Sequence, residues 1–392
     1  MFRLVHTADW HWEADKIDKC HASADFIIKK LRELKPDLHV IAGDYWNRRQ
    51  MLTKLSAVIP ALETMRQLAD ISPVVLIYGN EAHDAAGSYE IFRNLDTRFP
   101  IYVSERAETI SFHVPSHSFD STDSIDEATA ILHLFPYPTK QWFLAGKENL
   151  SIDESNQLIQ DALRNIFIGF GAISMEAPCP VIFVGHCNVS GAVLSSGQSL
   201  LGQDIMVGKR DLDLVRAHYY ALGHIHKPQR IAPGVHYSGS IYHCNFGEVE
   251  KKSFNLVEFD QAQVPKVLPI EIPSRPLSLH DLNWDEESGP QPMFWDPNDV
   301  VDWEGAELRV RVNATKEKHA LITDAEIESR YRLAHSITVD RIISPQERIR
   351  SSEIVKAKTL PEKVFEWGSS IQKEIPANVL TLAGDIERSI TL

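Results

Sequence analysis

Residues 2–11, FRLVHTADWH, carry the pattern that decides the fold: a short apolar run that ends directly in an Asp and a His. The same arrangement recurs further along the chain, at residues 38–44 (LHVIAGD), 74–80 (VVLIYGN), 181–186 (VIFVGH) and 219–226 (YYALGHIH). Short runs rich in Val, Ile, Leu and Tyr and bounded by Gly are typical of buried strands. Amphipathic stretches between them, such as residues 19–34 and 52–70, predict helices. The alternation predicts an α/β fold.

Polar side chains follow each of these predicted strands. They are two carboxylates, one amide and four imidazoles: Asp9, His11, Asp44, Asn80, His186, His224 and His226. Strand ends in such a sheet meet at one crevice, and glycines let the chain turn there. Seven oxygen and nitrogen donors exceed the needs of one tetrahedral ion and suit two divalent ions that share a carboxylate. A single Gly-Asp or Gly-His pair more often marks a turn or a helix cap, so the prediction rests on all five motifs together.

The length of 392 residues leaves room for two or three domains. We expect the catalytic domain over residues 1–262, an acidic linker over 263–305, a small α+β domain over 306–360 and C-terminal helices over 361–392. Residues 276–307 contain nine Asp and Glu and no Lys or Arg, and their Trp284, Trp295 and Trp303 are expected to anchor the linker on a domain.

Composition restricts the location and the partners of the chain. The net charge of -14 counts against an anionic partner such as nucleic acid, although the acidic segment supplies most of the excess. Four cysteines without a CxxC pair argue against a disulfide framework and favour a reducing cytoplasm. The longest apolar run, residues 166–173, is too short to cross a bilayer. We therefore expect a soluble cytoplasmic protein without a membrane partner.

The motif order DxH, GD, GN, GH and GHxH resembles the calcineurin-like metallophosphoesterase superfamily. Four longer segments are similar to the SbcD-type nucleases, the catalytic subunits of the SbcCD double-strand-break repair exonuclease. These segments are HTADWH (6–11), GHCNVSGA (185–192), YYALGHIHKPQ (219–229) and YSGSIYHCNFGEVEKKSFNLVEFD (237–260). The resemblance covers about residues 1–260. It implies a metallophosphoesterase β-sandwich flanked by helices, with a smaller α+β capping domain.

The resemblance also implies how the seven side chains divide between two ions. Asp9, His11 and His226 would bind the first ion. Asn80, His186 and His224 would bind the second, and Asp44 would bridge both. Two ions about 3.5–4 Å apart can clamp a phosphodiester for in-line attack. The family suggests Mn²⁺, although these ligand types would also accept Fe or Zn.

Several positions depart from the family pattern. The usual GNHD loop is GNEAHD here (79–84), so the general-acid role implied for the loop histidine passes to His83, with a loop cap as the alternative. His243 stands where an Arg is usual. Lys209, Arg210, Lys227 and His243 are the candidate DNA contacts, and for the basic residues an ordinary solvated surface is the alternative.

The leading interpretation is a metal-dependent DNA exonuclease and endonuclease, homodimeric and bound to an SbcC-type coiled-coil ATPase. One alternative is another phosphoesterase, acting on nucleotides, RNA or phosphoproteins. A second is a non-catalytic scaffold for the ATPase, against which the complete ligand set counts. For ATPase docking we expect the helices at 361–373 and 377–388, where Val379, Leu382 and Ile386 follow helical spacing. Packing of this face on the capping domain is the alternative.

Overall fold

The computed structural model describes residues 1–47, 54–147, 150–195, 198, 204–283, 303–343 and 352–390. The chain divides into two compact units, Met1–Leu277 and Ser278–Leu392. The start of the helix predicted from Leu52, the tryptophans Trp284 and Trp295, and most of the acidic stretch lie outside the described residues.

The first unit contains two large sheets. The first sheet has the strand order β15-β14-β1-β2-β3-β4. Its strands are β1 (Phe2–Thr7), β2 (Leu38–Ile41), β3 (Val74–Ile77), β4 (Ile101–Ser104), β14 (Ser253–Phe259) and β15 (Pro265–Glu271). Strands β1 to β4 run parallel, whereas β14 pairs antiparallel with β1 and with β15. The order of the parallel strands is the one expected for consecutive crossover units.

The second sheet has the strand order β12-β13-β11-β8-β7-β5-β6. Its strands are β5 (Glu108–His113), β6 (Ser118–Ser121), β7 (Ala130–Phe135), β8 (Val181–His186), β11 (Tyr219–Gly223), β12 (Gln229–Ala232) and β13 (Val235–Tyr237). A separate short pair joins β9 (Asn188–Val189) to β10 (Met206–Val207). Strand β8 lies between β7 and β11 and is parallel to both.

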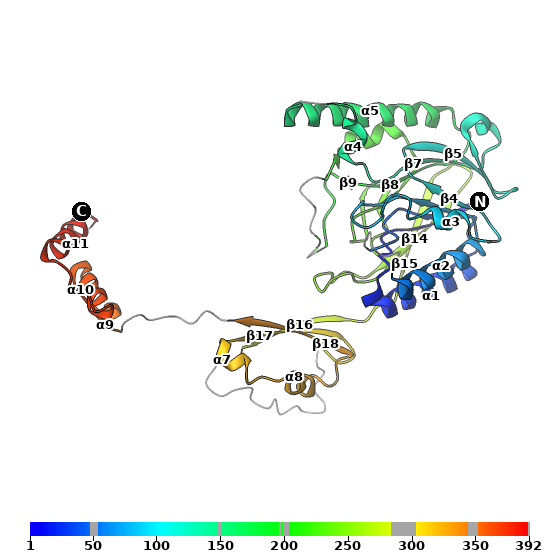
Figure 1. Cartoon of the computed structure of the whole chain (residues 1–392). Helices are drawn as coiled ribbons and strands as arrows, with labels where there is room; N and C mark the ends of the chain where they lie inside the picture. The colour runs from blue at the N-terminus through cyan, green and yellow to red at the C-terminus, as the bar shows by residue number, and fades with distance from the viewer. Residues whose placement is uncertain are drawn as a thin grey trace. The chain divides into compact units, whose positions relative to one another are not determined.

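The two sheets pack face to face, and helices cover their outer faces (Figure 1). Leu4, Val40 and Val75 of the first sheet contact Leu132 and Val184 of the second in one buried cluster. The residues that follow them in the strands, Val5, Ile41 and Leu76, belong to a different cluster with α1 and α2. Successive strand residues point to opposite faces, so strands buried on both sides read as continuous apolar runs. The predicted β-sandwich flanked by helices is confirmed.

Helix α5 covers the outer face of the second sheet, where its Phe167 and Phe170 pack with Phe183. A capping box at its start, formed by Ser151 and Glu154, satisfies two backbone N–H groups that lack helical partners. The helices of this unit are α1 (Ile17–Leu34), α2 (Leu55–Ala69), α3 (Glu90–Arg93), α4 (Lys140–Leu144), α5 (Ile152–Glu176) and α6 (Lys209–Leu212). Short 3₁₀ turns occupy Ala14–Lys16, Thr122–Glu127 and Asp213–Val215.

The second unit is a small α+β structure followed by helices. Strands β16 (Leu277–Asn283), β17 (Glu307–Ala314) and β18 (Ser336–Ile343) form its sheet, in that order, with β17 and β18 parallel. The helices are α7 (Lys316–His319), α8 (Asp324–Arg330), α9 (Ser352–Lys356), α10 (Leu360–Ser370) and α11 (Ala377–Ile390). Trp303 packs with Leu308 and Tyr331 in the core of this unit. Residues 263–305, the predicted linker, contain strands β15 and β16. Strand β15 pairs with β14 and so continues the first sheet into this segment.

Candidate metal centre

Five strand ends bring the predicted ligands together. Strands β1, β2 and β3 are parallel neighbours in the first sheet, and β8 and β11 are parallel neighbours in the second. The ligands lie at the carboxyl ends of these strands or just beyond them. Parallel neighbours end at the same edge of each sheet, and the two sheets pack face to face, so Asp9 of the first sheet and His224 of the second become neighbours. The His224 backbone N–H donates to Asp9 Oδ1 at 2.9 Å.

Close backbone approach at these strand ends explains the glycines. A Cβ on Gly43 would lie 2.3 Å from His186 Nδ1, and a Cβ on Gly79 would lie 2.1 Å from Asp44 Oδ1. Asp9, His11 and Asp44 themselves adopt left-handed backbone conformations, with φ of 51°, 47° and 51°. Such conformations cost energy in residues with side chains and concentrate at functional sites. The strained loops therefore point to a function rather than to packing alone.

Asp44 is at the middle of the cluster. Its Oδ2 lies 3.2 Å from His186 Nε2, 3.9 Å from His11 Nε2 and 4.0 Å from His83 Nε2. Its Oδ1 accepts a hydrogen bond of 2.6 Å from the Asn80 backbone N–H. Burial alone would raise the pKa of the Asp44 carboxyl, but His186 and His83 outweigh burial and hold the pKa below its usual value. Asp44 is thus an ionised carboxylate with imidazole nitrogens of three histidines within 4.0 Å of its Oδ2.

Two further groups of donors flank Asp44. Ligand atoms of Asp44, His186 and His224 lie within 4.8 Å of one another. The second group consists of Asp44, His11 and His83, and His11 Nε2 also lies 3.0 Å from His226 Nε2. The arrangement has the carboxylate between two clusters, as two neighbouring cations would need.

Neighbouring groups orient the imidazoles so that one nitrogen of each faces the centre. His186 Nδ1 donates to the Ala42 carbonyl at 2.7 Å, which leaves Nε2 toward Asp44. His226 Nδ1 contacts Glu248 Oε1 at 2.8 Å, which leaves Nε2 toward His11. Carbonyl and carboxylate partners of this kind hold metal-binding histidines in most metal sites.

Buried donor atoms without partners test whether the cluster suits a cation. Among the described residues, the buried atoms Asp9 Oδ2, His186 Nε2 and His224 Nε2 make no hydrogen bond, although carboxylates lie 3.2 Å from His186 Nε2 (Asp44) and 3.4 Å from His224 Nε2 (Asp204). Buried polar atoms are normally satisfied, because leaving one unpaired costs about 1–3 kcal/mol. Carboxylate and imidazole donors left open together fit divalent cations. Burial opposes protonation of His186, but Asp44 outweighs burial and raises the pKa of His186 to about 9.

The lengthened loop places Asn80 and His83 at the same edge. Asn80 Oδ1 accepts from the Ala82 backbone N–H at 2.9 Å and retains a second lone pair. His83 Nδ1 donates to the Asn47 carbonyl at 2.5 Å, and its ring lies 4.6 Å from that of His11 between centroids. The two inserted residues therefore do not carry His83 away from the cluster.

The candidate DNA contacts lie outside the ligand cluster. Lys209 and Arg210 are exposed on α6, and Lys227 is half-buried directly after His226. His243 Nε2 contacts the Glu250 carbonyl at 3.0 Å, so its ring is engaged within its own loop. No hydrogen bond or ion pair joins these four side chains to the seven ligands in the described part of the chain.

Sequence reasoning missed a set of supporting residues. Asp84 accepts from the backbone N–H groups of Asp44 (2.9 Å), Gly79 (2.8 Å) and Trp46 (3.1 Å), and so holds two ligand loops together. Glu248, fully buried, contacts His226, and Lys252 lies 2.6 Å from its other oxygen. A buried Asp, Glu or Lys has no local sequence signal, since the partner that permits burial is distant or across a turn.

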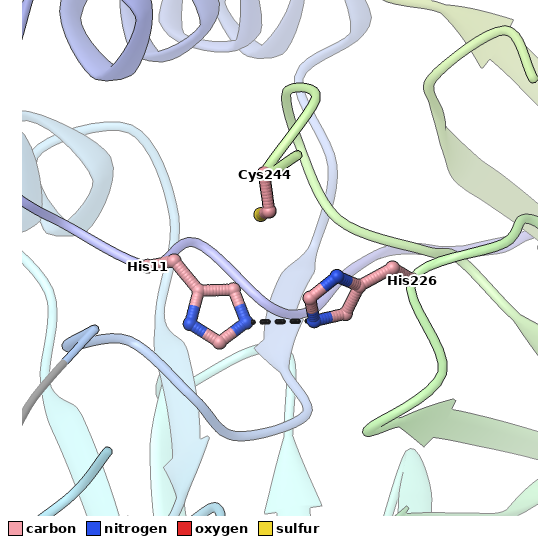
Figure 2. A group of neighbouring side chains, drawn as sticks. All are labelled: His11, His226 and Cys244. Carbon is pink, nitrogen blue, oxygen red and sulfur yellow. Dashed lines mark hydrogen bonds between the residues drawn. The ribbon is translucent and has the colours of Figure 1, made fainter. Parts of the chain in front are cut away.

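Three more residues near the cluster were also missed. Asp204 Oδ2 lies 3.4 Å from His224 Nε2, and the Tyr137 hydroxyl donates to the same carboxylate. The Cys244 sulfur lies within 4.8 Å of ligand atoms of His11 and His226 (Figure 2). The four cysteines are free, which agrees with the absence of a CxxC pair.

Comparison with known proteins identifies the family. The calcineurin-like phosphoesterase profile matches residues 2–228, more than half of the chain. The chain belongs to the calcineurin-like phosphoesterase family. This family uses divalent metals, in agreement with the His and Asp groups of the structure. No helix in the described ranges is both long and apolar enough to cross a membrane.

Two curated relatives of this phosphoesterase are both named as the SbcD subunit of nuclease SbcCD. The Escherichia coli K12 protein is 23% identical over 379 residues, which cover 90% of each chain. The Staphylococcus saprophyticus protein is 22% identical over 299 residues, which cover 72% of this chain and 73% of the relative. Among solved structures, a dimetal phosphatase from Danio rerio is 11% identical, with a TM-score of 0.42 over 69% of this chain and 99% of that one.

Proposed function

We propose that this phosphoesterase is a metal-dependent DNA exonuclease and endonuclease, the nuclease subunit of an SbcCD-like complex. The observation that supports the proposal is the gathering of His11, His83, His186 and His224 around the Asp44 carboxylate, with His226 beside His11 and with the buried Asp9 Oδ2 lacking a partner. Similarity to the Escherichia coli SbcCD nuclease subunit over 90% of both chains supports DNA as the substrate.

Asp9, His11 and His226 would hold one ion, Asn80, His186 and His224 the other, and Asp44 both. Two divalent ions, for which we propose Mn²⁺, would supply Lewis acidity toward the phosphoryl oxygens. They would also lower the pKa of bound water, so that hydroxide is available as the nucleophile at neutral pH. The chain itself positions these donors. Asp84 fixes the backbone of the Asp44 and Gly79 loops, and the Asn80 N–H fixes one oxygen of Asp44.

We assign the general-acid role to His83. Because a backbone carbonyl can only accept, the hydrogen bond to Asn47 keeps a proton on Nδ1 and turns Nε2 toward the centre. In the protonated ring, Nε2 can deliver a proton to the oxygen that leaves phosphorus. His83 is partly exposed, with about 31% of its side chain accessible, so it can meet a substrate and regain a proton from solvent.

The donor cluster does not by itself select the ester that is hydrolysed. Exposed Lys209 and Arg210 are our candidate phosphate contacts, with Lys227 and His243 nearer the ligand loops. At a net charge of -14 the whole chain repels DNA at long range, so binding would rely on such local positive charge and fall steeply with salt.

We also propose an SbcC-type coiled-coil ATPase as the partner, a homodimeric state and a cytoplasmic location. Val379, Leu382, Ile386 and Ile390 remain exposed along α11, which supports its use as a docking helix. An amphipathic face at this spacing can lie in an apolar groove or against a coiled coil.

The deciding experiment compares Asp44→Ala with Asp96→Ala, an exposed aspartate outside the cluster. With Mn²⁺ and linear double-stranded DNA, Asp44→Ala should abolish cleavage, whereas Asp96→Ala should cleave like the parent. Cleavage by a pure, folded Asp44→Ala protein would refute the two-ion centre. Parallel assays with RNA, a nucleotide ester and a phosphopeptide test the substrate, and preference for one of these over DNA would refute the nuclease assignment.

A further inference from the structure

Cys244 lies beside the metal centre but is not one of the seven predicted ligands. Its sulfur lies within 4.8 Å of ligand nitrogens of His11 and His226, whose Nε2 atoms are 3.0 Å apart. Figure 2 shows the Cys244 side chain reaching from its loop toward the two rings. Two imidazoles and a thiol thus share one corner of the site.

The loop that carries Cys244 is held in place by residues of the centre itself. The Cys244 backbone N–H donates to Glu248 Oε2 at 3.0 Å, and the other oxygen of this carboxylate contacts His226 at 2.8 Å. The Tyr242 hydroxyl donates to the His11 carbonyl at 2.6 Å, and Lys16 Nζ donates to the Cys244 carbonyl at 3.0 Å. Glu248 therefore aligns both His226 and Cys244, and the Tyr242 hydrogen bond ties the loop to His11.

Cys244 packs at the edge of the apolar cluster beneath the first sheet, and its sulfur faces His226. Its hydrogen bond is a long one, 3.8 Å to the Tyr242 carbonyl, and the residue is only partly buried. A cysteine kept purely for packing is usually fully buried, as Cys187 is here. Cys244 instead combines partial access, a fixed backbone and two neighbouring imidazoles.

We propose that Cys244 is a direct thiolate ligand of the first ion, beside His11 and His226. This inference rests on the proposed two-ion centre and changes its chemistry. A thiolate is a soft donor that favours Zn²⁺ and similar borderline ions over Mn²⁺ and Mg²⁺. The first position would therefore select Zn²⁺, while the second keeps only oxygen and imidazole donors. The thiol proton is released to solvent when the ion binds.

The test is spectroscopic and uses the full chain loaded with Co²⁺ in place of the native ions. Thiolate coordination gives a sulfur-to-cobalt charge-transfer band in the near ultraviolet, separate from the visible bands of Co²⁺ itself. The parent protein should show this band, and Cys244→Ser and Cys244→Ala should lack it. Cys179→Ala is the matched control, because Cys179 packs in a different cluster, and should retain the band.

Zn²⁺ affinity is the second measurement, by competition with a chelating dye. Cys244→Ser should bind Zn²⁺ at least about tenfold more weakly, since tenfold is the smallest loss of metal affinity expected when the surroundings of a metal ligand are altered. The Mn²⁺ affinity should be nearly unchanged. In the unaltered protein, Zn²⁺ should also slow alkylation of Cys244 by iodoacetamide at least tenfold, read by peptide mass spectrometry. That measurement needs no variant to fold.

The outcomes separate this inference from the proposed function. Visible Co²⁺ bands without a charge-transfer band would overturn ligation by Cys244 and leave the metal centre standing. A band that persists in Cys244→Ser, or alkylation at the same rate with and without Zn²⁺, would overturn it as well. Failure of the parent chain to bind Co²⁺ would overturn the two-ion centre and this inference together.

Discussion

Lys252 offers a test of how buried residues outside the ligand set hold the ligands of the centre in place. Its side chain is fully buried, and Nζ lies 2.6 Å from Glu248 Oε2, 3.0 Å from Glu250 Oε1 and 3.1 Å from the His226 carbonyl. All three ammonium protons therefore have acceptors. Burial opposes ionisation of Glu248, but His226 and Lys252 outweigh burial and lower the pKa of Glu248 to about 2.

Replacing Lys252 with Met keeps most of the volume and removes the cation. Glu248 would then be a buried carboxylate without its ammonium partner, and losing one partner of a buried pair costs about 3–5 kcal/mol. A unit of 277 residues unfolds with a large entropy, so about 2 °C of melting temperature corresponds to 1 kcal/mol. We therefore expect the melting temperature of Lys252→Met to fall by roughly 6–10 °C.

The assay is calorimetric unfolding of the intact, metal-free chain. Lys251→Met is the matched control, because the neighbouring Lys251 is exposed and its pair with Glu271 is a surface ion pair of small effect. Adding Glu248→Gln to Lys252→Met removes the uncompensated charge and should recover part of the loss. A Lys252→Met protein that melts within about 2 °C of Lys251→Met would refute the reasoning.

Three further predictions concern the acid, the pH response and the partner. His83→Ala should lower turnover by about 10²–10⁴-fold with unchanged metal content by elemental analysis; lost metal would make His83 a ligand, and normal turnover a loop residue. Burial lowers the pKa of His6, His39 and His133 to about 3 in the folded chain. As pH falls below about 6.5, these histidines therefore become protonated in the unfolded chain before they do in the folded chain, and the folded chain loses stability. Each should cost about 2 kcal/mol of unfolding free energy at pH 5 relative to pH 6.5, and equal urea midpoints at the two pH values would contradict this. Deleting residues 376–392 should preserve Mn²⁺-dependent cleavage of a short single strand and abolish co-purification with the ATPase; precipitation or lost cleavage would instead make α11 part of the core.

Local sequence was enough to predict the strands and the residues that follow them. The strand expected at the start of the chain is β1 (Phe2–Thr7), and the strand ends at Asp44, Asn80, His186 and His224 lie at one edge of the two sheets. This works because a strand buried on both faces is a continuous apolar run, and because parallel neighbours must end together. The assignment of these side chains as ligands stays a prediction.

The sequence revealed only one of the two reasons why the glycines are required. Backbone freedom at a turn, the expected reason, holds at Gly43, whose φ is +84°, but His186 and Asp44 also occupy the space that a Cβ on Gly43 or Gly79 would need. His186 is 143 positions from Gly43, and no local pattern reports a contact across two sheets.

Tertiary structure alone decided how the ligands are held. Glu248, Lys252 and Asp84 are charged residues that sequence reasoning would place at the surface, yet all three are buried. Each is buried because partners from distant segments, or from the facing side of a turn, satisfy its charge or its hydrogen bonds. Cys244 lies beside His11 and His226 for the same reason. Glu248 is close to Cys244 in sequence, but it aligns Cys244 with the centre only because it also contacts His226 in the folded chain. The amino-acid sequence by itself determined which elements form and which donor residues follow them, because strand burial and turn chemistry are local properties. The orientation of the donors, their charge and the softness of the ligand set depend on contacts that exist only after the two sheets have packed.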